Sequence, residues 1–158
     1  MPTPSPGPRP RPRDHTGRPL PPGSPDELGD GDPARSCTSA AQARERLAAC
    51  FAEGRHFAAH RVVLRLWRDL DVDAGPLWQA VAQLTAGAVH LERGNRAGAE
   101  TLLARAAERL AEPGLPEAGV DVAALAGVAE ELAARVGAGA LPAPRLPATA
   151  VSPRGGAP

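Results

Sequence analysis

Apolar residues recur every three or four positions along the middle of the chain, which is the spacing of one buried face of an α-helix. This pattern predicts helices over residues 39–54, 55–70, 76–93, 96–110 and 122–136. None of these segments alternates apolar and polar residues with the period of two that a half-buried strand needs, and β-branched residues are sparse. The fold class is therefore all-α, and we expect a compact bundle of about five helices with short connections.

Local signals mark the ends of these helices. Ser39 and Gln42 have the Ser-x-x-Gln spacing of a capping box at the start of the first helix. Pro76 falls in the first turn of the third helix, where its missing N–H costs nothing. Gly94 and Asn95 are typical of a left-handed C-cap followed by an N-cap. Such a short corner predicts that the third and fourth helices pack antiparallel.

Composition divides the chain into three parts. Residues 1–35 and 137–158 are crowded with Pro, Gly and Arg, and such segments carry too few large apolar residues to offset the chain entropy lost on folding. We therefore predict two disordered tails. Between them, residues 36–136 are rich in Ala, Leu, Val, Arg and Glu, which predicts one helical domain.

Charge and hydropathy exclude some classes of partner. The whole chain has a formal net charge of zero, and residues 36–136 hold 11 Arg against 13 acidic residues, so no basic surface for nucleic acid is implied. The longest apolar stretch, residues 80–91, is interrupted by Gln83, Thr85 and His90. We therefore expect no membrane-spanning segment.

The cysteines and the first residues bear on the compartment. Cys37 and Cys50 form an isolated pair, which in a reducing compartment is more often two free thiols than a disulfide. Cys50 falls on the apolar face of the first helix, where it would pack in the core. The first residues lack the apolar stretch of a secretory signal, so the expected localisation is cytoplasmic.

Two patterns that imitate metal sites are incomplete. Glu53-x-x-His56 has the spacing of a carboxylate-bridged dimetal motif, but Gly54 lies between the two residues and breaks the helix. The aspartates of residues 69–73 imitate the start of a calcium loop, without the Gly and Glu that complete it. We therefore expect no metal site and no cofactor.

Two blocks of aromatic, polar and glycine residues match the pattern of a known family. The first block consists of Phe51, Gly54, Phe57, Ala59, His60 and Trp67. The second consists of Gln79, Gln83, His90, Arg93, Gly94 and Asn95. Together they span residues 47–110 and resemble domain of unknown function 309 (DUF309), a small all-helical family. The resemblance implies an all-α fold and names no activity.

The acidic positions of the family pattern are not retained. Where family members usually carry glutamate, this chain has Ala58, Arg61 and Leu64. With those carboxylates, the family histidine could belong to a polar cluster that binds a metal or relays protons. The two histidines and one glutamine that remain are too few ligands for a strong divalent metal site.

Two functional hypotheses follow. The first is a non-enzymatic interaction or scaffold module, whose partner is an unknown protein or small molecule, with a homo-oligomer as one form of such an interaction. The alternative is a small-ligand-binding protein or enzyme that uses His60, Gln83 and His90 between the second and third helices, with Trp67 nearby. His60 and His90 are then the candidate catalytic residues. Under the purely structural interpretation, His60 is a buried imidazole bonded to Gln83 or His90, and Trp67 is a core anchor.

Overall fold

The computed structural model of the chain describes residues 11–27 and 33–153. Within these residues the α-helices are α1 (Ala40–Ala52), α2 (His56–Arg65), α3 (Gly75–Glu92), α4 (Arg96–Leu110), α5 (Val122–Gly137) and α6 (Ala148–Val151). A π-helix, η1 (Leu66–Leu70), and a short 3-10 helix, η2 (Val72–Ala74), connect α2 to α3. The described part of the chain contains no β-strand, so the prediction of an all-α fold is confirmed.

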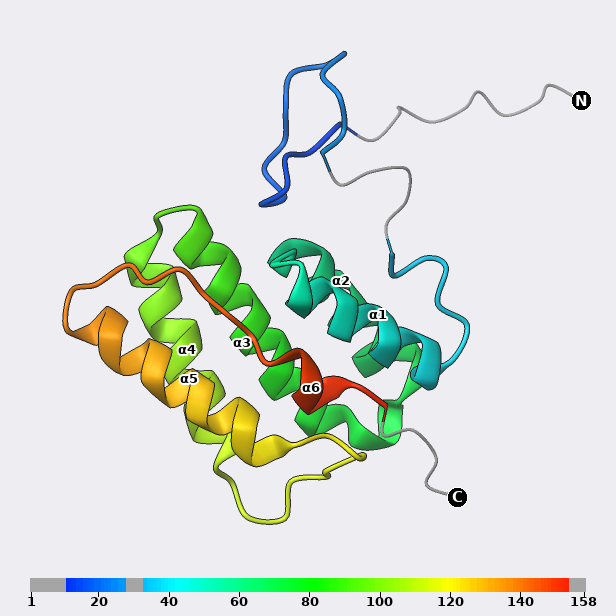
Figure 1. Cartoon of the computed structure of the whole chain (residues 1–158), viewed down its shortest axis with the longest axis vertical. Coiled ribbons are helices and arrows are strands. Elements are labelled where there is room, and N and C mark those ends of the chain that lie inside the picture. Colours follow the sequence, from blue (N-terminus) through cyan, green and yellow to red (C-terminus); the bar gives the residue numbers. More distant parts are fainter. Residues whose placement is uncertain (1–10, 28–32, 154–158) are drawn as a thin grey trace, which may run out of the picture.

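Helix α3 is the centre of the bundle. Figure 1 shows it between the pair α1–α2 on one side and the pair α4–α5 on the other. Its neighbour α4 follows after a short corner and packs back along it, whereas α5 packs against α4, and α1 against α2. The last helix, α6, returns across the bundle to contact α1.

The predicted capping residues lie at the start of α1 and at the corner between α3 and α4. The Ser39 hydroxyl accepts a hydrogen bond from the backbone N–H of Gln42 at 3.2 Å and so caps α1. The side chain of Gln42 reaches back one residue further than a capping box requires, and its oxygen accepts from the backbone N–H of Thr38 at 2.9 Å. Gly94 has a positive φ of 72°, and Asn95 caps α4. These contacts confirm the predicted corner between α3 and α4.

The predicted second helix changes its winding near its end. It is an α-helix only to Arg65, and the following five residues form the π-helix η1. The N–H of Asp71 closes this wide turn on the carbonyl of Leu66 at 2.8 Å. The side chain of Asp71 accepts a hydrogen bond from the Trp78 indole at 2.8 Å, which ties the end of the turn to α3.

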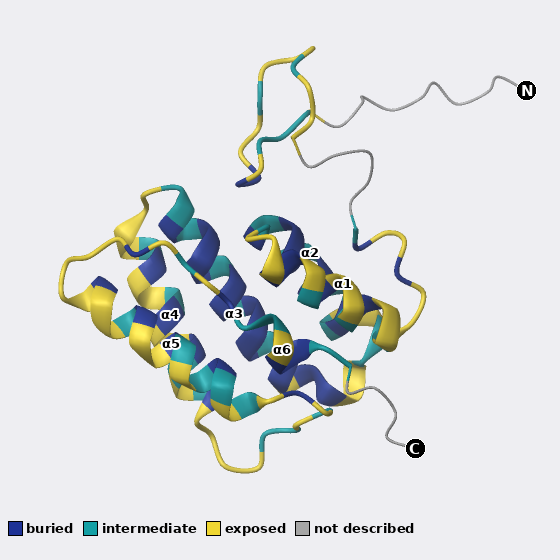
Figure 2. Cartoon of the chain, viewed as in Figure 1, coloured by how far each residue is buried: buried dark blue, intermediate teal, exposed yellow. Residues whose placement is uncertain are grey.

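The core is built around both faces of α3. Figure 2 shows buried residues along the inner sides of the helices, and 12 of the 18 residues of α3 are buried. Gly87 allows α3 and α4 to approach closely, since a Cβ there would lie 2.7 Å from the side chain of Leu103 on α4.

Although α3 is largely apolar, neither it nor another helix in the described ranges is long and apolar enough to cross a membrane. Cys37 and Cys50 are both buried, and no disulfide joins them.

The expectation that Trp67 is a core anchor of the second helix is met only in part. Trp67 is only partly buried, at the edge of the core, where its ring lies against Gly75. Trp78 on α3 is fully buried instead, with 0% of its surface exposed, and its N–H is paired with Asp71. The apolar pattern of α3 did not single out Trp78, because a helix buried on opposite sides has no unique apolar stripe.

Part of the C-terminal segment packs on the bundle, which differs from the expectation of a separate tail over residues 137–158. Leu146, Ala150 and Val151 are buried in the same core as the longer helices. The guanidinium of Arg44 on α1 donates to the carbonyl oxygens of Val151 and Ser152. The apolar residues of this segment lie outside any long helical repeat, so periodicity alone could not place them in the core.

The described part of the N-terminal segment, residues 11–27, also contacts the bundle. The carbonyl of Thr16 accepts two hydrogen bonds from Arg93, at 3.1 and 2.7 Å. Arg18 in turn donates to the carbonyl of Arg93 at 2.9 Å, and Gly17 lies against the ring of Phe57. These contacts place the segment over the start of α2 and the end of α3 (Figure 1).

The C-terminal contact predicts a difference between two leucines of one segment. Leu146 is 5% exposed, so Leu146→Ala should lower the free energy of unfolding by about 2–4 kcal/mol through lost burial and a cavity. Leu141 is 53% exposed, and Leu141→Ala should change it by less than about 0.5 kcal/mol. Urea denaturation followed by far-ultraviolet circular dichroism measures both values. Equal, small effects would show that the segment does not contribute to the core.

The two tryptophans should also differ. Trp78→Ala should cost about 3–5 kcal/mol of stability, because it empties a fully buried site and removes the donor to Asp71. Trp67→Ala should cost clearly less, since part of that ring already faces solvent. The same denaturation experiment ranks the two variants, and a larger loss for Trp67→Ala would contradict the observed core.

Candidate functional site

His60 lies on the face of α2 that packs against α3. Its Nδ1 is 2.9 Å from the hydroxyl oxygen of Thr85. Thr85 is fully buried and lies within hydrogen-bond distance of the carbonyl oxygens of Val81 and Ala82, one turn earlier in α3. Because the single hydroxyl proton of Thr85 is donated to a carbonyl, its oxygen is left to accept the Nδ1–H of His60.

Burial lowers the pKa of His60 below its usual value of 6.5, because desolvation disfavours the imidazolium. The carbonyl of Ala82 opposes this shift, whereas the positive charges of Arg61 and Arg68 and the proximity of His90 add to it. His60 is therefore neutral at neutral pH. A neutral imidazole that donates to an internal hydroxyl acts as a packing and orienting group of the α2–α3 contact.

Gln83 and His90 lie on a different strip of α3, which faces α4. On this strip Gln79 accepts from Arg109 at 3.1 Å, and Gly87 touches Leu103. His90 lies about one turn after Gly87 and two turns after Gln83. Its Nδ1 is 3.0 Å from the side-chain nitrogen of Asn95. Burial is the main cause that lowers the pKa of His90, and Arg93 adds to it.

The predicted polar set is therefore divided between two contacts. Thr85 stands two residues from Gln83, which on an α-helix is a rotation of about 200°, so the two side chains leave α3 on opposite sides. His60 is bonded to Thr85 on the side of α3 that faces α2, whereas His90 lies on the strip that faces α4 and is bonded to Asn95. The amide oxygen of Gln83 is buried and has no hydrogen-bond partner among the described residues.

A buried pair that the sequence did not suggest joins His56 to Glu92. The Nδ1 of His56, at the first residue of α2, bonds to the carboxylate of Glu92, at the last residue of α3. The side chains are 3% and 16% exposed. The two residues are 36 positions apart, so no local spacing could have indicated the pair. It ties the start of α2 to the end of α3.

The residues of the two sequence patterns that imitate metal sites do not come together in the structure. Glu53, at the end of α1, is exposed and lies 3.7 Å from Arg55, whereas His56 turns to Glu92. Asp69 pairs with Arg65, and Asp71 with Trp78. Among the residues that the structure describes, no group of three His, Cys, Asp or Glu side chains is placed to hold a metal ion.

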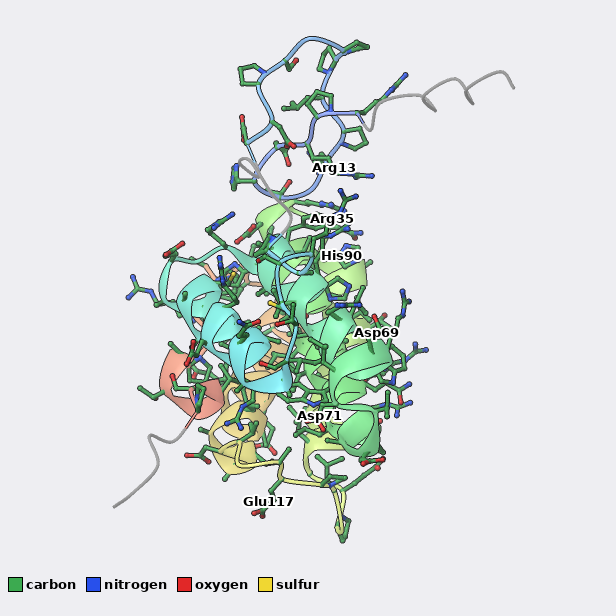
Figure 3. All side chains as sticks on the ribbon, turned by 90° about the vertical axis from the view of Figure 1, so that its right-hand side faces the viewer. Arg13, Arg35, Asp69, Asp71, His90 and Glu117 are labelled. Carbon is green, nitrogen blue, oxygen red and sulfur yellow. The ribbon has the colours of Figure 1, made fainter. Side chains whose placement is uncertain are left out.

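An open cleft of about 450 Å³ lies on the outer side of α2. Its lining consists of Ala34, Arg35, Arg61, Leu64, Arg65, Arg68 and Asp69. The last five of these come from α2 and η1, and the first two come from the segment that precedes α1. Figure 3 shows Arg35 and Asp69 on the same side of the molecule. We call this feature the arginine cleft.

The described lining of the arginine cleft is positively charged. Among the residues that the structure describes, four arginines and one aspartate line it, so these side chains carry a formal charge of +3. Arg65 Nη1 and Asp69 form a short ion pair of 2.6 Å, so this aspartate is already engaged. The Nε of Arg65 is buried and has no hydrogen-bond partner among the described residues. A cleft of this kind attracts anions and repels metal cations.

Two features of the sequence are consistent with this cleft. Arg61, Arg65 and Arg68 have the spacing i, i+4 and i+7, which places three cations on one face of a helix. Arg61 and Leu64 also occupy two of the positions at which the resembling family usually has glutamate. Arg35 could not be added from the sequence, because it reaches the cleft only through the packing of α1 on α2.

Comparison with known proteins supports the resemblance. The family model described as "Domain of unknown function (DUF309)" matches residues 45–102, from within α1 to within α4, which confirms the predicted resemblance. No curated protein and no solved structure shows a significant match to the chain. The matched family is itself uncharacterised, so the function has to be argued from the residues of this chain.

The burial of His60 predicts a pH dependence of stability. Because the pKa of His60 is lower in the folded state than in the unfolded chain, the unfolded state binds the proton more readily. Stability that is present above about pH 6.5, the ordinary histidine value, should therefore fall as the pH drops below it. His60→Gln should flatten this fall, whereas His15→Gln, which changes an exposed histidine of the N-terminal segment, should not. Melting temperatures between pH 5 and 8 test the difference.

Proposed function

We propose that this chain is a non-enzymatic binding module that holds an anionic group of its partner in the arginine cleft. The observation that carries the proposal is the cleft itself, an open volume of about 450 Å³ whose described lining holds four arginines and one aspartate. Its shape is concave, and it presents guanidinium groups that match the geometry of carboxylates and phosphates.

The remaining polar residues support binding more than catalysis. His60 and His56 are bonded inside the bundle, to Thr85 and Glu92, whereas the partly exposed His90 is bonded to Asn95 at the corner between α3 and α4. A general base has to reach a substrate proton, and an imidazole enclosed between packed helices does so poorly. The arginine cleft, by contrast, is open to a ligand without any rearrangement of the core.

The alternative function, a ligand-binding protein or enzyme built on His60, Gln83 and His90, receives less support from this geometry. Its residues leave α3 in opposite directions, and no described hydrogen bond joins them. The buried amide oxygen of Gln83, which has no described partner, is the one observation in its favour. If the wild-type protein turned over a substrate and a folded His60→Ala variant did not, this alternative would be favoured.

Removal of two cleft arginines should abolish anion binding without unfolding the domain. We expect a multivalent anion from a panel of acetate, citrate and phosphate to raise the melting temperature of the wild type at constant ionic strength. Ligand at 100 times its dissociation constant adds about 2.7 kcal/mol, or roughly 2–4 °C for each kcal/mol in a chain of this size. Arg61→Ala/Arg68→Ala should lose that increase.

The matched control removes two charges elsewhere. Arg105 on α4 and Arg135 on α5 are exposed and lie outside the cleft lining. Arg105→Ala/Arg135→Ala should keep the full increase in melting temperature. The proposal is contradicted if no anion stabilises the wild type, or if both double variants respond as the wild type does.

A further inference from the structure

The described N-terminal segment, residues 11–27, is buried at one turn only. Within this segment Thr16 and Gly17 are buried, and Figure 2 shows the rest of it as exposed or intermediate. None of its described residues belongs to the hydrophobic core of the bundle. The segment is therefore held by a local contact, as a bound ligand is, and its removal would leave the core packed.

The turn is organised by its own hydrogen bonds. The side-chain oxygen Oδ1 of Asp14 accepts from the backbone N–H groups of Thr16 and Arg18, each at 2.9 Å, and from the hydroxyl of Thr16 at 2.7 Å. The carbonyl of Asp14 accepts from the N–H of Gly17, also at 2.9 Å. A turn that is fixed in this way loses less conformational freedom when it docks, which favours binding.

The surface under the turn consists of Phe57, near the start of α2, and Arg93, at the end of α3. We call it the Phe57–Arg93 surface. The guanidinium of Arg93 donates twice to the carbonyl of Thr16, at 3.1 and 2.7 Å, and lies 6.0 Å from the centroid of the Phe57 ring. The carbonyl of Arg93, at the C-terminus of α3 where helical partners run out, accepts from Arg18 at 2.9 Å. The surface thus offers donors, an acceptor and an aromatic face to one turn.

The contact with Phe57 requires glycine at the tip of the turn. A Cβ at Gly17 would lie 2.3 Å from the Phe57 ring, far inside the contact distance of about 3.5–4.0 Å between two carbon atoms. Gly17 also has a positive φ of 84°, which disfavours other residues. Gly23 has a similar φ of 89°, yet a Cβ there would meet nothing within 4 Å. The two glycines therefore differ in the contact that they make, and not in their backbone conformation.

The surface is held in place by the bundle itself. His56 and Glu92, each one position before a residue of the surface, form the buried pair that ties the start of α2 to the end of α3. The part of the chain that matches the family model, residues 45–102, contains Phe57 and Arg93 but not the N-terminal segment. The surface is therefore built without the segment that it holds.

We propose that the Phe57–Arg93 surface is a docking site for a peptide turn with glycine at its tip, and that residues 14–18 of this chain are its resident ligand. The inference does not depend on the arginine cleft, and it goes beyond the proposed function. A tethered ligand competes at an effective concentration on the order of millimolar, so another segment gains access to the site only when the resident turn is released. The N-terminal segment thus controls access to a second interaction surface.

A peptide added to the full chain tests the docking site. The probe is a synthetic peptide of residues 11–27 with blocked ends, whose three arginines balance its three acidic residues, so net charge does not drive binding. The full-length Gly17→Ala chain, whose own turn cannot pack on Phe57, should bind the peptide saturably in isothermal titration calorimetry. The wild type should bind it about tenfold more weakly or less, because its own turn occupies the site. The Gly23→Ala chain should behave as the wild type does.

Further variants separate this site from binding elsewhere. A peptide that itself carries Gly17→Ala should not bind the Gly17→Ala chain. The Gly17→Ala/Arg93→Ala chain should bind the wild-type peptide at least about tenfold more weakly than the Gly17→Ala chain, because Arg93 supplies both donors to the Thr16 carbonyl. The matched control, Gly17→Ala/Arg105→Ala, removes an exposed arginine of α4 and should keep the affinity of the Gly17→Ala chain.

Amide NMR spectra of the full chain show whether the resident turn is docked. Gly17→Ala should shift the resonances of Phe57 and Arg93 and leave those of α5 in place, whereas Gly23→Ala should shift neither set. Unchanged resonances of Phe57 and Arg93 in Gly17→Ala would overturn the inference, because the turn would then not be docked. Shifted resonances without saturable peptide binding would also overturn it and make the segment a fixed structural part. Equal binding to the wild-type and Gly17→Ala chains would place the peptide elsewhere and contradict the site.

Discussion

The burial of α3 on opposite sides is the constraint on which the rest of the structure depends. A helix enclosed by α2 and by α4 has to place each polar side chain against an internal partner, because an unpaired buried polar group costs about 1–3 kcal/mol. Thr85 meets this need through His60 on α2, and Gln79 through Arg109 on α4. Most polar residues of α3 are thereby committed to the contacts that hold the bundle together, and Gln83, with its unpaired amide oxygen, is an exception.

That commitment is one reason why the proposed binding site lies on the outer face of α2. The inner face of α2 packs Val62 and Val63 against the core with no exposed surface. Its outer face carries Arg61 and Arg65, which line the cleft, and no helix of the described residues contributes to that lining except α2 and η1. The same helix thus has an apolar inner side that packs in the core and a basic outer side that lines the cleft.

Local signals were enough for most of the fold, and tertiary contacts explain what they missed. Ser39, Gly94 and Asn95 fix helix ends through hydrogen bonds and φ values within a few residues, so the sequence indicates them directly. The packing of Leu146 cannot be found in this way, because it depends on how the helices come together in one core. The pair of His56 and Glu92 likewise joins helix ends that only the folded bundle brings together.

The candidate site also depends on tertiary contacts that the sequence alone does not indicate. The resemblance implies glutamates at the positions of Arg61 and Leu64, and their absence suggested a dismantled polar cluster, yet the structure places both residues in one cleft with three further arginines. Position 61 therefore carries a positive charge where the resemblance implies a negative one. Residues 36–136 still hold more acidic residues than arginines, 13 against 11, and charges beyond about 8 Å are screened at physiological salt. A long polyanion would meet that acidic surplus, whereas a small anion meets mainly the arginines of the cleft.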